Sequence, residues 1–235
     1  MNILALVAHP DDVEYMCSGT LMKYRDAGHK IFIALTTSGN TGSNVIPTSG
    51  ELAQIRESEQ LEAAKAYDAE VRFLRFDDEG LLDNEETRRA VLTAIRWANP
   101  DVILTHAPQD PSTDHAMTAR LTTQMIQSVG GKLHPADLPP IDKRPQIFFC
   151  DIAAGINFLP EAYVDISDYM DKKAELIRCH KSQFAWMADV VTSEDFTDDA
   201  YVLSRLRGLQ YKCKYAEAFT AHRIQGFVAD YRLLP

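Results

Sequence analysis

The chain has 235 residues, enough for a large domain with a buried core. Hydrophobic residues make up 46% and charged residues 25%, as in ordinary globular proteins, so disorder and fibrous repeats are excluded. The net charge of -10 at pH 7 disfavours binding to duplex nucleic acid or to an anionic membrane surface.

The sequence also indicates where the protein works. It contains no apolar run of about 18 residues, the length that a membrane-spanning helix needs. The apolar residues 3–8 form too short a stretch for a secretory signal, and no basic residue precedes them. The cysteines lie far apart and form no metal-binding or disulfide motif. We therefore expect a cytoplasmic protein without a membrane span, whose thiols are reduced.

The first half of the chain alternates between two kinds of apolar pattern. Short apolar runs predict buried strands at residues 2–8, 30–35, 71–75 and 101–105. Helical spacing predicts helices at residues 15–27, from the capping pair Thr48 and Glu51 to about residue 67, and from the capping pair Asp83 and Glu86 to about residue 99.

The second half is less regular. A helix is predicted from near Asp114, followed by a proline-rich connection, a strand at 146–150 and a long helix at about 167–180. Strands that alternate with helices predict an α/β fold, with a Rossmann-like, mostly parallel sheet and helices on both faces. Because too little sequence follows the proline-rich stretch for a second core, we expect a single domain over residues 1–235.

Polar residues follow the ends of four predicted strands. They are found at residues 9–12, at residues 36–42, at Asp77 and Asp78, and at residues 106–115. The carboxyl ends of parallel strands meet at one edge of a sheet, where ligands bind. We therefore expect four loops to bring carboxylates and imidazoles to one place.

These residues suit a metal ion. His9, Asp11 and Asp12 lie within one turn, and His115 can add a second imidazole. Zinc accepts such a mixture of nitrogen and oxygen ligands, and so does ferrous iron. Successive side chains of an extended segment diverge, so one aspartate can ligate while the other faces the water as a base. The structural alternative is a turn with an aspartate cap, with Asp114 as a second helix cap.

Together these motifs resemble the LmbE-like deacetylases, a family that includes GlcNAc-phosphatidylinositol de-N-acetylase and the deacetylases of mycothiol and bacillithiol synthesis. The resemblance rests on His9-Pro10-Asp11-Asp12, on the R-x-x-E pattern of Arg56 and Glu59, and on Asp114-His115. Residues 164–167, 180–183 and 215–219 follow in the family's order, so the resemblance spans nearly the whole chain.

The resemblance implies a zinc-dependent hydrolase that removes the acetyl group from an N-acetylglucosamine derivative or a similar small amide. His9, Asp12 and His115 would ligate the metal, and Asp11 would take a proton from the metal-bound water. Asp114 would orient the neighbouring base.

The sequence departs from the family at one position. The family's second metal motif usually begins with a histidine that stabilises the oxyanion or protonates the leaving amine, and here Ser112 stands in its place. Serine can donate a hydrogen bond but cannot act as an acid near neutral pH. Asp11 could serve first as base and then as acid, which we favour because it needs no further residue. Alternatively, His106 or His222 could reach the site, or the chain has drifted towards poor catalysis.

The expected partner is a small acetylated amino sugar, for which glucosaminyl malate is one candidate. Arg56 would contact the sugar or its anionic substituent. The resemblance also allows a homo-oligomer, since members of the family often assemble in that way. Two other functions remain open. One is a catalytically weak or inactive sugar-binding relative, suggested by Ser112. The other is a nucleotide-binding protein, although the loop at 37–42 lacks the glycine fingerprint and the P-loop lysine.

Overall fold

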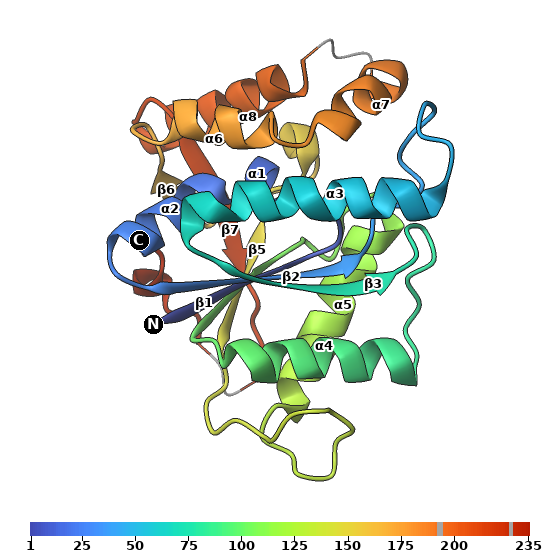
Figure 1. The fold of residues 1–235 in the computed structure, drawn as a ribbon. Coiled ribbons are helices and arrows are strands. Elements are labelled where there is room, and N and C mark those ends of the chain that lie inside the picture. The colour runs from blue at the N-terminus through green and yellow to red at the C-terminus, as the bar shows by residue number, and fades with distance from the viewer. Residues whose placement is uncertain (192–194, 226–227) are drawn as a thin grey trace.

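A seven-stranded sheet crosses the middle of the molecule in the order β3-β2-β1-β4-β5-β7-β6 (Figure 1). The computed structural model describes residues 1–191, 195–225 and 228–235. All neighbouring strands pair in parallel except β7, which is antiparallel to both β5 and β6. The strands are β1 (Asn2–Val7), β2 (Lys30–Thr37), β3 (Glu70–Phe76), β4 (Val102–Thr105), β5 (Gln146–Cys150), β6 (Ala162–Asp165) and β7 (Ala216–Ala221).

Helices cover both faces of this sheet. On one face lie α4 (Glu85–Ala98) and α5 (Thr113–Met125), which Figure 1 shows below the strands. On the other face lie α1 (Asp12–Met16), α2 (Ser18–Asp26), α3 (Ser49–Ala64), α6 (Met170–Ile177), α7 (Lys181–Val191) and α8 (Phe196–Tyr211). The predicted α/β class, with a mostly parallel sheet between two helical layers, is confirmed.

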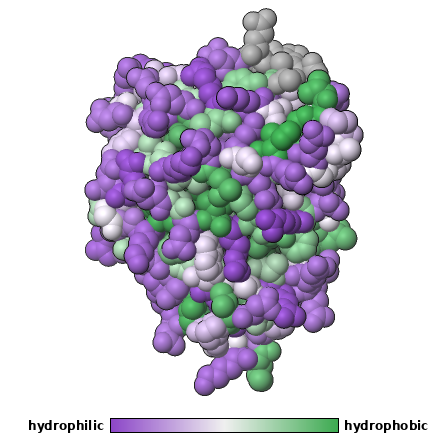
Figure 2. Space-filling view, viewed as in Figure 1, coloured by the Kyte–Doolittle hydropathy of each residue, from purple (hydrophilic) through white to green (hydrophobic). Residues whose placement is uncertain are grey.

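Strand β1 shows why the buried strands read as unbroken apolar runs. Its side chains point alternately to the two faces of the sheet. Ile3, Ala5 and Val7 join the core beneath α2, whereas Leu4 and Leu6 join the core beneath α4 and α5. All five are fully buried, so both faces of the strand require apolar residues. Hydrophilic residues cover most of the outer surface in the view of Figure 2.

The first predicted helix is divided into two. Helix α1 begins at Asp12, and the chain leaves the helical conformation at Cys17, where φ is -142°. Helix α2 then begins with its own terminal N–H groups, which the buried carboxylate of Glu217 satisfies: Gly19 N donates to it at 3.0 Å and Thr20 N at 2.8 Å. A carboxylate nearly 200 residues away along the chain therefore stabilises this break, which local spacing could not predict.

Two other helix boundaries differ from the prediction. Helix α4 is capped by Asn84, which exchanges hydrogen bonds with Thr87, and the predicted cap Asp83 instead pairs with Arg88. The predicted helix at 167–180 covers only the span of α6, because the turn before it is held by Asp165 and Ser167. Strands β6 and β7 and helices α7 and α8 were not predicted. No helix within the described residues is long and apolar enough to cross a bilayer.

Candidate active site

The turn from β1 to α1 places His9 and Asp12 at the carboxyl edge of the sheet. The Asp12 side chain accepts a hydrogen bond from His9 N at 2.6 Å, and Asp12 N donates to His9 O, which closes the turn. His115 comes from the first turn of α5, which follows β4, the neighbour of β1 in the sheet. Parallel strand ends therefore bring together residues that are 106 positions apart.

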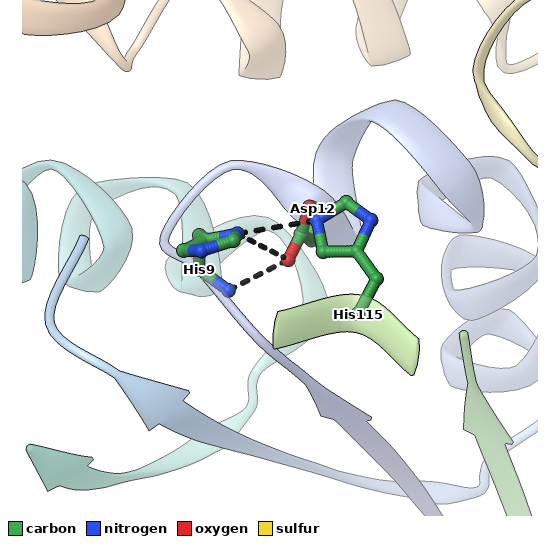
Figure 3. A group of neighbouring side chains, drawn as sticks. All are labelled: His9, Asp12 and His115. Carbon is green, nitrogen blue, oxygen red and sulfur yellow. Dashed lines mark hydrogen bonds and ion pairs between the residues drawn. The ribbon is translucent and has the colours of Figure 1, made fainter. Parts of the chain in front are cut away.

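The predicted ligand atoms converge (Figure 3). His9 Nδ1 lies 3.2 Å from His115 Nε2 and 3.5 Å from Asp12 Oδ2, and His115 Nε2 lies 3.3 Å from Asp12 Oδ1. Ligands bound to zinc at about 2.0–2.1 Å in tetrahedral geometry are about 3.3–3.4 Å apart. Each pair of side chains approaches to about that separation, Asp12 through Oδ2 towards His9 and through Oδ1 towards His115, so this donor set suits a metal ion of that size.

A carboxylate lies behind each of the two imidazoles. His9 Nε2 is 2.9 Å from Asp78 Oδ1, and His115 Nδ1 is 3.1 Å from Asp110 Oδ2. Metal-binding histidines commonly present their second nitrogen to a carboxylate, which fixes the ring's orientation and makes it a stronger ligand. The sequence contained a signal for both aspartates, because each lies in a loop that follows a strand. It did not show which imidazole each would support.

The electrostatic environment of the cluster also suits a cation. Burial would lower the pKa of His9, but hydrogen bonds with Asp114, Asp12 and Asp78 raise it well above its usual value. Burial likewise opposes the charged form of His115, yet the charge of Asp12 and the contact with Asp110 raise its pKa to about 9. The negative field that favours protonated imidazoles would also favour a bound metal ion.

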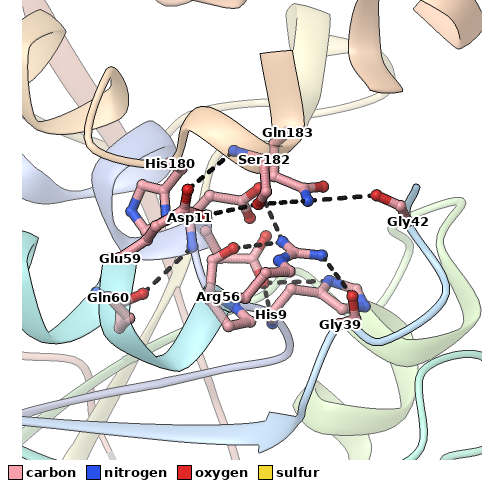
Figure 4. Close-up of polar contacts among 12 residues, drawn as sticks. His9, Asp11, Gly39, Gly42, Arg56, Glu59, Gln60, His180, Ser182 and Gln183 are labelled. Carbon is pink, nitrogen blue, oxygen red and sulfur yellow. Dashed lines mark hydrogen bonds and ion pairs between the residues drawn. The ribbon is translucent and has the colours of Figure 1, made fainter. Parts of the chain in front are cut away.

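Asp11 lies in the same turn as His9 and Asp12, and its backbone is strained. Its φ is 112°, a conformation that non-glycine residues rarely adopt. The backbone N of Asp11 donates to Gln60 Oε1 at 3.2 Å, and its carboxylate accepts from Arg56 Nη2 at 3.0 Å (Figure 4). Burial raises the pKa of Asp11, and the charge of Arg56 opposes that rise. The fold therefore holds Asp11 apart from the cluster, as a base would require.

Arg56 contacts neighbouring loops of the protein, whereas the sequence predicted a contact with the sugar. Its guanidinium lines the cavity, but the residue is only 3% exposed, and it donates to Gly39 O at 2.9 Å and to Pro10 O. A Cβ atom at Gly39, where φ is 59°, would lie 2.3 Å from Arg56 Nη1. The glycine of this loop therefore makes room for an arginine, and the phosphate-cradle interpretation gains no support.

Sequence reasoning missed a buried network behind Asp11. The carboxylate of Glu14 is fully buried and accepts hydrogen bonds from Gln60 Nε2 at 3.1 Å and Tyr67 Oη at 3.2 Å. His180 Nε2 lies 3.0 Å from the other oxygen of Glu14. Since Gln60 also binds the backbone of Asp11, this network supports the strained turn. The sequence signal for it was the place of His180 in the family's order.

Helix α7 is fastened to the same region by the second half of the R-x-x-E pattern. Glu59 accepts from Ser182 N at 2.9 Å and from Ser182 Oγ at 2.7 Å. Gln183 Nε2 donates to Gly42 O at 3.3 Å. These contacts set the position of α7 relative to the loop that follows β2.

Neither of the two alternative histidines lines the cavity. His106 is fully buried and stacks behind His115 with ring centroids 3.9 Å apart, and its Nε2 accepts from Ala8 N at 2.9 Å. Burial and the charge of His115 lower the pKa of His106 to about 4. It does not line the cavity. The position of His106 therefore corrects the idea that it contacts the substrate.

His222 lies even further from the predicted place. It follows β7, whose antiparallel direction carries its end towards the start of β5, where His222 N donates to Ile147 O at 3.0 Å. Its ring packs edge-on against Phe149. The four strands that supply the site end at the opposite edge, so the proposed contact of His222 with the substrate is wrong.

The two remaining predicted residues lie at the cavity. Asp114 is buried, and its carboxylate accepts from Glu79 N at 2.7 Å and lies 3.4 Å from His9 Nε2. This contact orients the imidazole of His9, which is one of the candidate metal ligands. Ser112 occupies the N-cap position of α5 without a side-chain capping bond, and it lines the cavity. Its hydroxyl is therefore available to a ligand.

One cavity of about 1020 Å³ is lined by His9, Asp11, Asp12, Arg56, Ser112, Asp114 and His115. Its floor is formed by the candidate metal ligands and the loops after β1 to β4, and its far side by α7 and α8. A volume of this size is at the upper end of typical ligand sites, which span about 300–1,000 Å³. The arrangement provides a candidate metal centre, the separate carboxylate of Asp11 and space for a ligand.

The chain is similar to known deacetylases. Residues 4–126 match the family model of GlcNAc-PI de-N-acetylase (PIG-L). Diacetylchitobiose deacetylase of Thermococcus kodakarensis is 30% identical over 78% of this chain and 70% of its own length. A probable N-acetyl-α-D-glucosaminyl L-malate deacetylase of Bacillus anthracis is 24% identical over 78% of this chain and 82% of its own.

A solved structure shares the fold. N,N′-diacetylchitobiose deacetylase from Pyrococcus horikoshii superimposes with a TM-score of 0.82 at 24% identity, covering 96% of this chain and 86% of that one. These matches confirm the predicted enzyme class, a hydrolytic N-deacetylase. The chain belongs to the GlcNAc-PI de-N-acetylase family of LmbE-like deacetylases.

Proposed function

We propose that this protein is a zinc-dependent hydrolase that removes the acetyl group from an N-acetylglucosamine derivative. The observation that carries the proposal is the convergence of His9, Asp12 and His115, each within 3.5 Å of the other two, beside the separate carboxylate of Asp11. Relatives named as deacetylases of acetylated glucosamine compounds support the substrate class. Ferrous iron accepts the same donors and is the second candidate metal.

His9, Asp12 and His115 would hold the ion, and Asp78 and Asp110 would fix the two imidazole rings. When bound, zinc supplies a Lewis acid that acidifies water to a pKa of about 7 and polarises a carbonyl oxygen. The remaining steps are performed by side chains that line the cavity.

Asp11 takes the proton from the attacking water as the new bond to the acetyl carbon forms. The same carboxyl group then gives that proton to the sugar nitrogen as the carbon–nitrogen bond breaks, which yields acetate and a free amine. The burial that raises the pKa of Asp11 helps it to hold the proton between these steps. Ser112, with its free hydroxyl, donates a hydrogen bond to the carbonyl oxygen as negative charge develops there.

Asp11→Asn tests this assignment. Removing a positioned general base typically slows a reaction by about a hundredfold to ten-thousandfold. We therefore expect a loss of that size in acetate release from N-acetylglucosamine conjugates, while the zinc content, measured by elemental analysis, is unchanged. Asp198→Asn is the matched control, because Asp198 is exposed on α8 and does not line the cavity. Unchanged acetate release in Asp11→Asn would remove Asp11 from the mechanism.

The second candidate function is a sugar-binding relative with little or no catalysis, and Ser112 in place of the family's histidine is the observation that favours it. Acetate release that stops with a chelator and returns with zinc supports the enzyme. Sugar binding without any acetate release under either condition supports the binding protein.

A further inference from the structure

The cavity extends well beyond the groups that would act on an acetyl group. Across from the metal cluster lies an apolar wall, which we define as the side chains of α7 and α8 that line the cavity: Trp186, Met187, Phe196, Val202, Leu203 and Leu206. A single sugar held at the cluster would leave much of this volume unfilled. The wall therefore faces whatever substituent the sugar carries.

The charges around the cavity have one predominant sign. Seven carboxyl groups line it, and among the described residues a single guanidinium does so: Asp11, Asp12, Asp78, Glu79, Asp110, Asp114, Asp199 and Arg56. That guanidinium is already paired with Asp11 and with backbone carbonyls. A bound divalent cation would leave the cavity negative. An anionic substituent would therefore be repelled, because like charges interact strongly in a partly enclosed cavity.

Two side chains of the apolar wall are exposed although they line a cavity, and the other four are half-buried. Val202 is 69% exposed and Leu206 is 43% exposed, and their spacing of four residues places them on the same side of α8. Phe196, at the start of the same helix, is held by Tyr15, whose ring stacks on it with centroids 4.9 Å apart. An exposed apolar surface that is continuous with an active-site cavity is typical of a surface that a ligand covers.

Building on the proposed function, we propose that the cavity selects an uncharged acetylated amino sugar whose substituent is a ring with an apolar face, and that it discriminates against anionic conjugates. The ring packs on the apolar wall, while the acetyl group lies at the metal cluster. The C–H face of a second sugar and an aromatic ring share this chemistry. A malate or phosphate substituent lacks it and adds the wrong charge.

A panel of substrates that differ only in the substituent tests this selection. It comprises N-acetylglucosamine as its methyl glycoside, its phenyl β-glycoside, diacetylchitobiose, the malate glycoside and the 1-phosphate. Burial of a ring predicts a kcat/KM for the phenyl glycoside about tenfold to a hundredfold above that of the methyl glycoside. We expect diacetylchitobiose to exceed the methyl glycoside as well, and both anionic conjugates to fall below it. Added salt should raise the kcat/KM of the anionic conjugates relative to that of the methyl glycoside, because salt screens the repulsion.

Two pairs of variants connect this selection to named residues. Val202→Thr keeps the side-chain shape and should lower the ratio of phenyl to methyl turnover severalfold, whereas Val228→Thr, which is exposed outside the cavity, should not. Asp199→Asn should raise the ratio of malate to methyl turnover severalfold, and Asp198→Asn, its neighbour outside the cavity, should leave that ratio unchanged.

The outcomes separate this proposal from the proposed function. Suppose that the methyl glycoside is turned over and that the malate conjugate has a kcat/KM as high as that of the phenyl glycoside. This result overturns the proposed selection but leaves the proposed deacetylase function intact. If no substrate releases acetate, the deacetylase fails, and calorimetric binding of the same panel still ranks the substituents. A changed elution volume of Val202→Thr in gel filtration would show that a second copy of the chain covers the wall, which also overturns the proposal.

Discussion

The two halves of the chain contribute to the cavity in different ways. Among the described residues, the first half, from β1 to α5, supplies every candidate metal ligand and both carboxylates behind the imidazoles, and it coincides with the segment that matches the family model. The second half supplies the apolar wall on α7 and α8. Parallel strand ends thus bring the candidate ligands together, whereas helices packed over the sheet form the far side of the cavity.

Two histidines illustrate the difference. His115 follows a parallel strand and reaches the metal cluster, whereas His222 follows an antiparallel strand and ends at the opposite edge. Both come directly after or near a strand end in the sequence. The direction of the strand that precedes a histidine therefore decides at which edge of the sheet its imidazole lies.

The largest loss of stability is expected from replacing Arg56, which joins loops of the first half of the chain. Arg56→Met keeps the apolar stem but removes the cation that joins Gly39, Pro10 and Asp11. Breaking a buried ion pair on one side costs about 3–5 kcal/mol. We expect a loss of that order in the free energy of unfolding, measured by urea denaturation.

An exposed arginine provides the control for this measurement. Arg89 pairs with Asp137 at the surface, and both side chains are more than half exposed. Arg89→Met should cost at most about 1 kcal/mol, as is typical of surface ion pairs. Equal losses in the two variants would show that Arg56 does not hold the loops of the first half together.

The same comparison explains what the sequence could predict. Strands β1 to β5 are short apolar runs, and the parallel arrangement predicted for them brings the loops that carry His9, Asp12 and His115 to one edge, so local pattern and one topological rule were sufficient for the place of the site. Which side chains would ligate a metal came from the family resemblance. The break at Cys17 depends on Glu217, and the wall depends on how α7 and α8 pack. Such contacts join distant segments, and no local pattern records them.

The next prediction tests whether the first half performs the reaction without the family's histidine. Ser112→Ala removes the free hydroxyl at the start of α5. Loss of one donor to a developing oxyanion lowers kcat about a hundredfold. We expect kcat for acetate release to fall by about that factor with little change in KM. Ser112→Thr, which keeps the hydroxyl, should recover most of the rate, and an unchanged kcat in Ser112→Ala would exclude this donor.

The smallest effect is expected where the two halves meet, at the buried contact between His180 and Glu14. Burial lowers the pKa of His180, but the hydrogen bond and charge of Glu14 outweigh it and raise the pKa above its ordinary value. A raised folded-state pKa contributes stability that is fully present below the unfolded pKa of about 6.5. That contribution is lost as the pH rises through the folded-state value.

His180→Gln should therefore destabilise the protein most below the unfolded pKa of about 6.5, with the difference from the unaltered chain shrinking as the pH rises through the raised folded-state pKa. Urea denaturation at a series of pH values measures this difference. His134→Gln is the matched control, because His134 is exposed and far along the chain from Glu14. A difference that grows with pH would mean that His180 is neutral in the folded protein, and that the two halves meet through an uncharged hydrogen bond.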